Sequence, residues 1–354
     1  MDDTTLLSEL TTLRLGGPAG RLVEARSEQE IVAAVAEVDA ASEPLLVLAG
    51  GSNLVVADDG FRGTVLRIAT RGVERCEPDD GWLRLDVEAG EDWDAFVAGC
   101  VAEELAGIEA LSGIPGSIGA TPIQNVGAYG QEVCDVIVAV RALDRVTGEI
   151  CELEPEDCGF EYRSSVFKRQ PHRWVVLRVS YALERSALSG PVHYAELARR
   201  LGVEPGDRAP IRDVRGAVLE LRRGKGMVLD PADPDSVSAG SFFTNPVLSA
   251  GAFADLTRRA ADRLGADVRP PAWRQPGDRV KTSAAWLIER ADFTRGHGNP
   301  DGIAISSKHT LALTNRGAGT TTELVALARE IAAGVRDAFG VELVPEPVLV
   351  GERW

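Results

Sequence analysis

Apolar and polar positions follow two periods along this chain, one typical of helices and one typical of strands. Residues 28–41 place apolar side chains at helical spacing behind a Ser27 cap, which predicts a helix. The same period predicts helices over 93–107, closed by Gly107, and over 209–226, 252–265, 282–291 and 323–340. Short apolar or alternating runs predict strands at 45–50, 55–58, 64–69, 82–90, 136–144, 174–183 and 311–315.

This mixture predicts an α+β (mixed α/β) fold, and 354 residues suggest two or three domains. Helices and strands do not strictly alternate between residues 55 and 100, so a plain Rossmann sheet is not expected. Residues 228–240 (VLDPADPDSVSAG) are rich in Pro, Asp and Ser and are the best candidate for a linker.

Charge and cysteine usage narrow the class of protein. Thirty-eight basic and 54 acidic residues give a net charge of −16, which disfavours a nucleic-acid binder. Five cysteines without C-x-x-C spacing indicate reduced thiols and a cytoplasmic protein. The acidic start, the short apolar runs and the unpaired histidines lead us to expect no signal peptide, no membrane insertion and no metal site. The oligomeric state stays open, and a monomer is compatible with the sequence.

A glycine loop follows the predicted strand at 45–50. It reads Gly50-Gly51-Ser52-Asn53-Leu54. Adjacent glycines allow positive φ and let backbone N–H groups converge on an anion. Taken alone, the same pattern also fits an ordinary glycine-rich turn, and it lacks the G-x-G-x-x-G spacing of dinucleotide-binding helices.

A second, longer loop spans residues 113–130 (GIPGSIGATPIQNVGAYG). Five glycines among small neighbours indicate a backbone pressed against a flat or phosphorylated group. Tyr129 offers a stacking surface, and Gln124 and Asn125 offer amides for a heteroaromatic edge. The alternative is an ordinary surface loop, but a solvated loop would not need large apolar residues such as Ile114 and Ile118. The two loops together suggest a bound dinucleotide in a non-Rossmann cradle.

Five segments then occur in one order: VLAGGSNLVV, GIPGSIGATPIQNVGAYGQE, EYRSSVFK, AGSFFTNP and LVPEPVLVG. Together they resemble the UDP-N-acetylenolpyruvoylglucosamine reductase (UDP-N-acetylmuramate dehydrogenase) family, flavoenzymes of peptidoglycan precursor synthesis. The resemblance runs from about residue 8 to residue 351. It implies a two-part FAD-binding module of the vanillyl-alcohol-oxidase type and a C-terminal α/β domain for a UDP-sugar.

The resemblance also implies an organisation and a reaction. We expect FAD-binding subdomains at 1–70 and 71–228, a UDP-sugar domain at 229–335, and a tail at 336–354 that returns to the active site. NADPH would reduce FAD, and the reduced flavin would reduce the enolpyruvyl ether of UDP-N-acetylglucosamine enolpyruvate. Covalent flavin relatives use His or Cys near the ring, and the glycine loops contain neither, so FAD is expected to be non-covalent.

The family motifs assign roles residue by residue. The cofactor-binding residues would be Gly50, Gly51, Ser52, Asn53, Leu54, Ile114, Pro115, Gly116, Ser117, Gly119, Ala120, Gln124, Asn125, Gly127, Ala128, Tyr129 and Gly130. Three residues are implied as catalytic. Arg163 would stabilise the enolate-like charge, Ser241 would protonate the α-carbon, and Glu346 would assist the enolate, which requires a protonated carboxyl in the closed site.

The remaining implied residues bind substrate. Tyr194 matches the tyrosine of a loop that covers the UDP-sugar in one subclass, and Lys225 matches a lysine that contacts substrate and helps NADPH. The others are Asn245, Trp273, Arg295 and His309.

Two departures from the family pattern stand out. Val348 occupies a position where some members carry Arg, and the stretch from Lys225 to Ser241 is longer than in some relatives. Two other functions remain open. The first is a flavin oxidase, which would not need Arg163, Ser241 and Glu346. The second is a catalytically idle sensor of a UDP-sugar or flavin, which would keep the glycine loops but would not need Ser241 as a proton donor.

Overall fold

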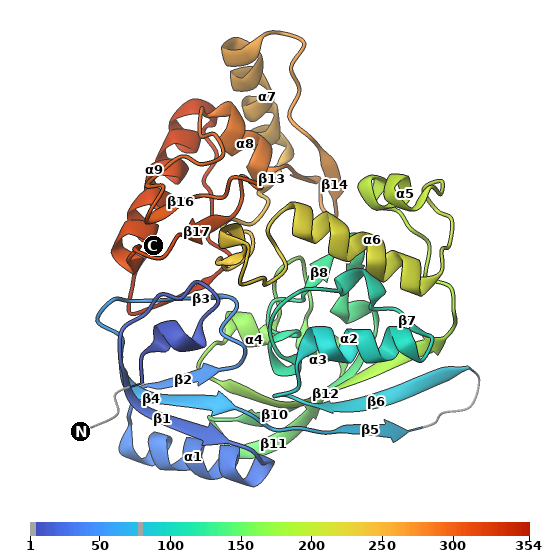
Figure 1. Cartoon of the computed structure of the whole chain (residues 1–354), viewed down its shortest axis with the longest axis vertical. Helices are drawn as coiled ribbons and strands as arrows, with labels where there is room; N and C mark the ends of the chain where they lie inside the picture. The colour runs from blue at the N-terminus through green and yellow to red at the C-terminus, as the bar shows by residue number, and fades with distance from the viewer. Residues whose placement is uncertain (1–4, 77–80) are drawn as a thin grey trace. The chain divides into compact units, whose positions relative to one another are not determined.

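The computed structural model describes residues 5–76 and 81–354, which form two compact units (Figure 1). Unit 1 comprises residues 19–51, 61–76 and 81–224, and unit 2 comprises residues 5–18, 52–60 and 225–354. Residues 1–4, which hold the acidic start of the chain and of the first expected domain, lie outside the described residues.

Unit 1 begins with a small parallel sheet in the order β1-β4-β2. Its strands are β1 (Ala19–Ala25), β4 (Phe61–Ile68) and β2 (Leu45–Leu48). The predicted first helix is confirmed as α1 (Glu28–Ala41), and the Ser27 hydroxyl accepts a hydrogen bond from the Glu30 N–H at 3.2 Å. The helix packs on β1 and β4 (Figure 1).

A larger antiparallel sheet forms the centre of unit 1. Its strands run in the order β11 (Glu149–Leu153), β10 (Ile137–Asp144), β12 (Trp174–Arg185), β6 (Trp82–Glu88) and β5 (Val73–Cys76). A short β7 (Leu105–Ala106) also pairs with β12. Beside the sheet, α2 (Trp93–Ala102) buries Trp93 and Phe96, whose rings lie 6.0 and 5.4 Å from that of Tyr181. These aromatic contacts anchor the helix that carries Asp94.

Shorter elements complete unit 1. They are the helices α3 (Pro155–Cys158), α4 (Val166–Arg169), α5 (Ala195–Leu201) and α6 (Ile211–Gly224), the hairpin β8 (Gly127–Ala128) and β9 (Gln131–Glu132), and the 3-10 turns η2 (Glu109–Leu111), η3 (Ile118–Ala120) and η4 (Val133–Asp135). Helices α5 and α6 pack on each other around a small core of their own that includes Val214 and Val218.

One predicted helix end is wrong. Helix α2 ends at Ala102 and not at Gly107. Glu104 adopts φ +57°, which turns the chain out of the helix, and the next two residues pair with β12. A Cβ on Gly107 would lie 2.9 Å from Val136, so this glycine serves close packing and does not cap the helix.

Unit 2 contains a parallel pair, an antiparallel sheet and a hairpin. The pair joins β3 (Leu54–Val56) to β18 (Val348–Val350). The sheet runs β13 (Val247–Ser249), β15 (Arg279–Lys281), β14 (Trp273–Gln275), and the hairpin joins β16 (Ile303–Ile305) to β17 (Leu313–Asn315). The helices are α7 (Ala250–Leu264), α8 (Ala284–Arg290) and α9 (Thr321–Phe339), with 3-10 turns η1 (Leu7–Leu10) and η5 (Pro234–Ser236). Helix α9 supplies much of the unit's apolar core.

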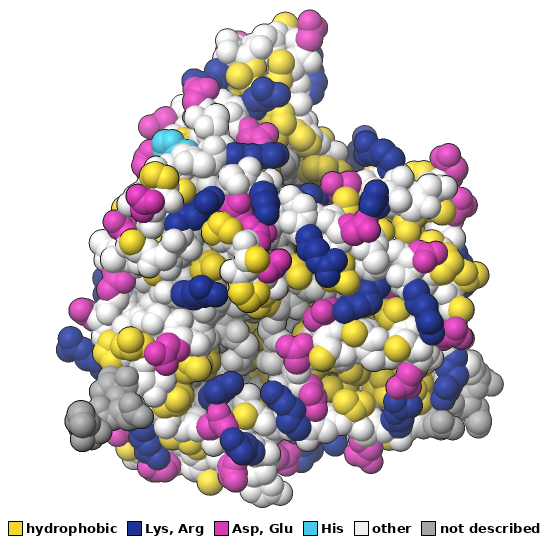
Figure 2. All heavy atoms as spheres, in the orientation of Figure 1, with side chains coloured by type: hydrophobic (Ala, Val, Ile, Leu, Met, Phe, Trp, Pro, Cys, Tyr) yellow, Lys and Arg dark blue, Asp and Glu magenta, His cyan; other side chains and the backbone are white. Residues whose placement is uncertain are grey.

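This content confirms the expected mixed helix-and-sheet fold class. Within the linker expected at 228–240, residues 229–232 are exposed, but residues 235–239 are buried, so the second half is not a solvated linker. Over residues 5–76 and 81–354, no helix has the length and apolarity needed to span a bilayer. On the face shown in Figure 2, basic and acidic side chains are interspersed, without a continuous basic stripe.

Candidate active site

The two glycine loops touch each other inside unit 1. Gly50 and Gly51 follow β2, and Gly51 adopts φ +59°. A Cβ on Gly50 would lie 2.6 Å from the Cα of Gly116, closer than any real Cβ approaches backbone. A glycine at position 50 is therefore required for this contact between the start of the first loop and the second loop.

The second loop is fixed at its start by hydrogen bonds to α2 and to the residues that precede it. The Gly113 N–H donates to Asp94 at 2.6 Å, the Ile118 N–H to the Glu91 carbonyl at 2.9 Å, and the Gly119 N–H to the Ala89 carbonyl at 2.8 Å. Asp94 also accepts from Arg215 of α6 at 2.6 Å. Burial alone would raise the pKa of Asp94, but Arg215 and the Gly113 N–H lower it below its ordinary value. The Asp94 carboxyl that holds the start of the loop is therefore ionised.

The turn at residues 117–120 presents a polar atom without a protein partner. The Ser117 hydroxyl is buried, and within the described part of the chain it makes no hydrogen bond. A buried hydroxyl normally has a partner, so one on the glycine surface fits a ligand oxygen or nitrogen at this place. The backbone N–H groups of the glycine loops and the Ser117 hydroxyl are hydrogen-bond donors that fit the phosphates and polar edges of FAD.

The 121–130 loop is held in a strained conformation. Asn125 and Tyr129 adopt φ +46° and +50°, which residues with side chains rarely do. The Asn125 amide donates to Glu132 at 2.8 Å and to the Glu161 carbonyl at 3.2 Å, and its oxygen accepts from the Cys134 N–H at 3.2 Å. These contacts hold the loop's shape. That the side-chain amide of Asn125 contacts the cofactor stays a prediction.

Arg163 lies against the backbone of that loop. It adopts φ +53°, donates to the Asn125 carbonyl at 3.1 Å and also donates to the Gly127 carbonyl. The guanidinium also lies 5.3 Å from the centre of the Tyr162 ring. The sequence therefore places a cation on the predicted cofactor loop, with its fork oriented by two carbonyl groups.

Tyr129 and Tyr194 form an edge-to-face pair with ring centres 5.2 Å apart. Tyr194 precedes α5 and is exposed, whereas burial raises the pKa of Tyr129 to about 12. The tyrosine predicted to cover substrate thus packs on the tyrosine of the second glycine loop.

In unit 2, a short ladder of backbone hydrogen bonds sets Phe242, the residue after Ser241, beside Glu346. The Glu346 N–H donates to the Phe242 carbonyl at 2.8 Å, and the Thr244 N–H donates to the Val344 carbonyl at 3.1 Å. On its other side, the Phe242 N–H donates to the Leu311 carbonyl at 2.7 Å. Phe242 is fully buried, so the residue before it has a fixed place.

Asn53 joins this group from the first glycine loop. Its carbonyl accepts from the Val348 N–H at 2.9 Å, and its amide donates to the Glu346 carbonyl at 3.4 Å. Unit 2 therefore brings together three of the predicted residues, Asn53, Ser241 and Glu346. Val348, which stands where some members carry Arg, is half-exposed at the start of β18.

The other predicted substrate residues lie in unit 2 at several places. Asn245 accepts from the Ala284 N–H at the start of α8 at 2.9 Å. Lys225 and His309 are half-buried, and His309 lies in the turn between β16 and β17, where its N–H donates to Ser306. Trp273 opens β14 and is 48% exposed, and Arg295 is exposed beside Gly296.

Sequence reasoning missed Thr12. Its hydroxyl is within hydrogen-bond distance of the Ser238 carbonyl at 2.7 Å and of the Ser52 carbonyl at 3.5 Å. It thereby links the segment before Ser241 to the first glycine loop. The family resemblance already covered residue 12, but a hydroxyl that bonds distant carbonyls leaves no local pattern in the sequence.

Comparison with known proteins defines the class first. Residues 19–154 match the model of an FAD binding domain, which includes both glycine loops, so the chain is an FAD-binding flavoprotein. Residues 231–350 match the model of the UDP-N-acetylenolpyruvoylglucosamine reductase C-terminal domain.

Full-length relatives carry the same name. The chain is 57% identical to UDP-N-acetylenolpyruvoylglucosamine reductase of Thermobifida fusca over 98% of its own length and 96% of the relative's. It is 58% identical to the enzyme of that name from Streptomyces coelicolor, over 98% and 89% of the two chains. The solved structure of that reductase from Thermus caldophilus has the same fold, with a TM-score of 0.64 and 24% identity over 98% of each chain. The chain belongs to the UDP-N-acetylenolpyruvoylglucosamine reductase family and is an oxidoreductase.

Proposed function

We propose that this protein reduces the enolpyruvyl ether of UDP-N-acetylglucosamine enolpyruvate to UDP-N-acetylmuramate, with NADPH as the reductant. The observation that supports this most is the backbone ladder that fixes Ser241 beside Glu346 and Asn53. Reduction of a carbon–carbon double bond needs a hydride, a proton donor and stabilisation of the intermediate negative charge. The ladder brings together the two segments that carry the Ser241 hydroxyl and the Glu346 carboxyl, and these two groups suit the last two needs.

FAD, when bound, supplies hydride transfer from NADPH to the β-carbon of the enolpyruvyl group. The protein's own residues handle charge and proton. The fixed fork of Arg163 would balance the negative charge that develops on the α-carbon and carboxylate. The Ser241 hydroxyl would give its proton to the α-carbon, and Glu346 in its protonated form would assist the enolate. The hydride and the proton together saturate the double bond.

Further parts of the proposal concern organisation. FAD is held without a covalent bond, chiefly by the residues of the two glycine loops. The subdomains are those expected at 1–70 and 71–228, with the UDP-sugar domain at 229–335 and the tail at 336–354. The five free cysteines support a reducing compartment, the cytoplasm.

The direct test is the visible spectrum of purified protein under anaerobic conditions. NADPH should bleach the flavin band, and UDP-N-acetylglucosamine enolpyruvate should restore it. A band that bleaches but returns only with oxygen would identify a flavin oxidase instead. A protein that binds FAD but accepts no hydride would be the sensor.

A variant separates the two half-reactions. Ser241→Ala should bind FAD and accept hydride from NADPH, but its reduced form should fail to be reoxidised by the enolpyruvyl sugar. Loss of the first half-reaction as well would mean that Ser241 shapes the site and is not the proton donor.

A further inference from the structure

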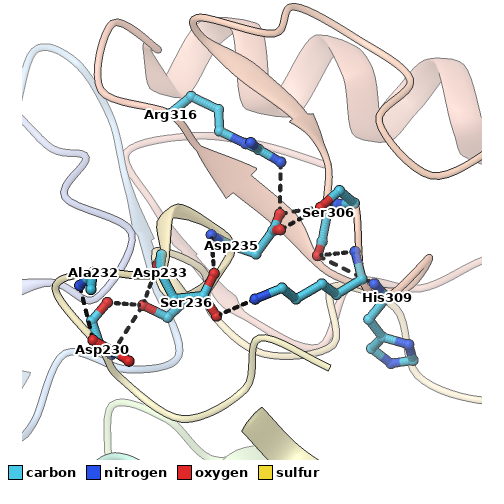
Figure 3. A network of polar contacts seen from close by, with 10 residues as sticks. Asp230, Ala232, Asp233, Asp235, Ser236, Ser306, His309 and Arg316 are labelled. Atoms are coloured by element: carbon cyan, nitrogen blue, oxygen red, sulfur yellow. Dashed lines mark hydrogen bonds and ion pairs between the residues drawn. The ribbon is translucent and has the colours of Figure 1, made fainter. Parts of the chain in front are cut away.

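The segment before Ser241 is built around one buried carboxylate, that of Asp235. Its side chain is 4% exposed and lies 2.7 Å from the guanidinium of Arg316 (Figure 3). It also accepts from the Ser307 N–H at 3.0 Å and from the Ser307 hydroxyl at 2.5 Å. Three contacts from two strand ends thus meet on one side chain, because Ser307 follows β16 and Arg316 follows β17.

The bonds around Asp235 favour its ionised form. Burial alone would raise its pKa, but the Ser307 donors and the Arg316 charge lower it below the ordinary value. The neighbouring Asp233 adds an ion pair of 2.7 Å to Lys308 (Figure 3). Two ion pairs, Asp233–Lys308 and Asp235–Arg316, therefore hold the 230–236 turn on the β16–β17 hairpin.

From Asp235 the chain continues to Ser241 along the same hairpin. The Asn315 N–H donates to the Val237 carbonyl at 3.0 Å, and Ser238 forms a bridge with Thr314. The Phe242 N–H then donates to Leu311 at 2.7 Å. The hairpin that holds Asp235 is thus the one that holds the residues on both sides of Ser241.

On the basis of these contacts, we propose that Asp235 is a positioning residue for Ser241. The Asp235 carboxylate fixes the register of residues 237–242 on β17 and the turn before it, and this register sets the place of the Ser241 hydroxyl. The role rests on the proposed function, in which that hydroxyl gives a proton to substrate. It explains why the second half of a segment rich in Pro, Asp and Ser is buried.

The test variant is Asp235→Asn, which keeps the size of the side chain and removes its charge. Gly226 packs closely on residue 235, since a Cβ added to Gly226 would lie 2.9 Å from the Cβ of Asp235. Asparagine keeps this Cβ and therefore preserves the packing beside Lys225. Reoxidation of the reduced holoenzyme by the enolpyruvyl sugar should slow about 10- to 100-fold, with reduction by NADPH changed less than about twofold. Arg316→Gln should reproduce the defect, and the double variant should be no slower than either single one.

Asp144→Asn is the matched control. Asp144 is also 4% exposed and lies 2.7 Å from an arginine, Arg173, but it belongs to β10 of unit 1. Both variants should lower the melting temperature, and only Asp235→Asn should slow reoxidation selectively. If the two variants behave alike, or if Asp235→Asn loses both half-reactions together with its FAD, the positioning role is wrong.

Amide hydrogen exchange tests the register without any assay of activity. In Asp235→Asn the amides of Phe242 and Asn315 should exchange at least about tenfold faster than in the parent, and in Asp144→Asn they should not. Unchanged exchange would overturn the inference. If the parent enzyme itself fails to be reoxidised by the enolpyruvyl sugar, the proposed function fails, and the exchange data still decide whether Asp235 fixes the segment.

Discussion

At the scale of single residues, Gly50 makes the contact that joins the two glycine loops. Replacing it with alanine would drive a Cβ to 2.6 Å from the backbone of Gly116, so one glycine loop must move. Gly50→Ala should therefore lose most of its FAD while unit 1 stays folded. The measurement is the flavin-to-protein absorbance ratio after gel filtration, with far-ultraviolet circular dichroism to confirm folding.

Gly99→Ala is the control for this prediction. Gly99 is exposed inside α2, and nothing lies within 4 Å of its added Cβ. It should keep its FAD and gain up to about 1 kcal/mol of stability, since alanine is the better helix former. If Gly50→Ala binds FAD as well as Gly99→Ala does, the contact between the loops is not needed for the cofactor.

Arg163 gives a second prediction at this scale. Arg163→Lys should slow reoxidation of reduced enzyme by the enolpyruvyl sugar about 100- to 1000-fold, the usual effect of losing a donor to a developing negative charge. A lysine cannot supply the two-pronged donor that now meets the Asn125 and Gly127 carbonyls. Stopped-flow absorbance of the flavin band measures the rate.

Arg169→Lys serves as its control, because Arg169 also donates to a backbone carbonyl, that of Gly159, at 3.0 Å, but from an exposed position. Reoxidation in Arg169→Lys should stay within about twofold of the parent rate. Equal rates in the two lysine variants would remove Arg163 from the proposed chemistry.

At the scale of secondary-structure elements, helix α9 depends on Asp58 for its start. The Asp58 carboxylate accepts from the Thr321 N–H at 2.7 Å and from the Thr322 N–H and hydroxyl at 2.9 and 2.7 Å. Asp58→Ala should cost about 1–3 kcal/mol of unfolding free energy, since it leaves helix N–H groups without partners. Thr322→Ala, which removes only the hydroxyl bond, should cost about 1 kcal/mol.

Urea unfolding of both variants checks this order. A loss in Asp58→Ala that is no larger than in Thr322→Ala would show that water replaces the carboxylate at the helix start. Burial would raise the pKa of Asp58, but the Thr322 and Thr321 donors lower it, so this stabilisation is present above the unfolded pKa and is lost as pH falls through the folded one.

Local periodicity predicted elements well where one face is apolar and the ends carry caps. Helix α1, with its Ser27 cap, was predicted to the residue. The same reasoning failed at the end of α2, because the pairing of Leu105 and Ala106 with β12 comes from residues 78 or more positions away. It also failed for the second half of 228–240, which is buried, since the partners of Asp235 lie at positions 307 and 316. The composition of a segment indicates whether it would be solvated by itself. It cannot show that an arginine far along the chain, here Arg316, pairs with one of its carboxylates.

The candidate site divides in the same way. Sequence motifs predicted the two glycine loops, and the contact of Gly50 with Gly116 fits that reading. The side-by-side placement of Ser241 and Glu346 could be implied only by resemblance, because about a hundred residues separate them and the ladder that joins them is made by backbone groups. Thr12 and Asp235 act through side-chain contacts with distant segments, which no spacing rule encodes.

At the scale of the whole molecule, the groups that titrate in mild alkali are unevenly distributed. All five cysteines and all four tyrosines of the chain fall within unit 1, and unit 2 has neither residue type. Burial raises the pKa values of Cys100, Cys158 and Tyr129 to about 12, and it also raises that of Tyr181. Alkaline pH should therefore weaken unit 1 selectively through these groups.

The sign of this effect follows from linkage. A thiol whose pKa is raised by folding stabilises the native state fully below the unfolded pKa of about 8.5, and this stability is lost as pH rises through the folded pKa. For the buried Cys100 the loss should reach about 1.4 kcal/mol per pH unit between pH 9 and 10. Urea unfolding of the parent and of Cys100→Ala at pH 7.5, 9 and 10 measures it. The alanine variant should show a shallower decline, whereas Cys76→Ala, which removes an exposed thiol, should follow the parent. A decline equally steep in all three proteins would mean that Cys100 reaches water before unit 1 unfolds.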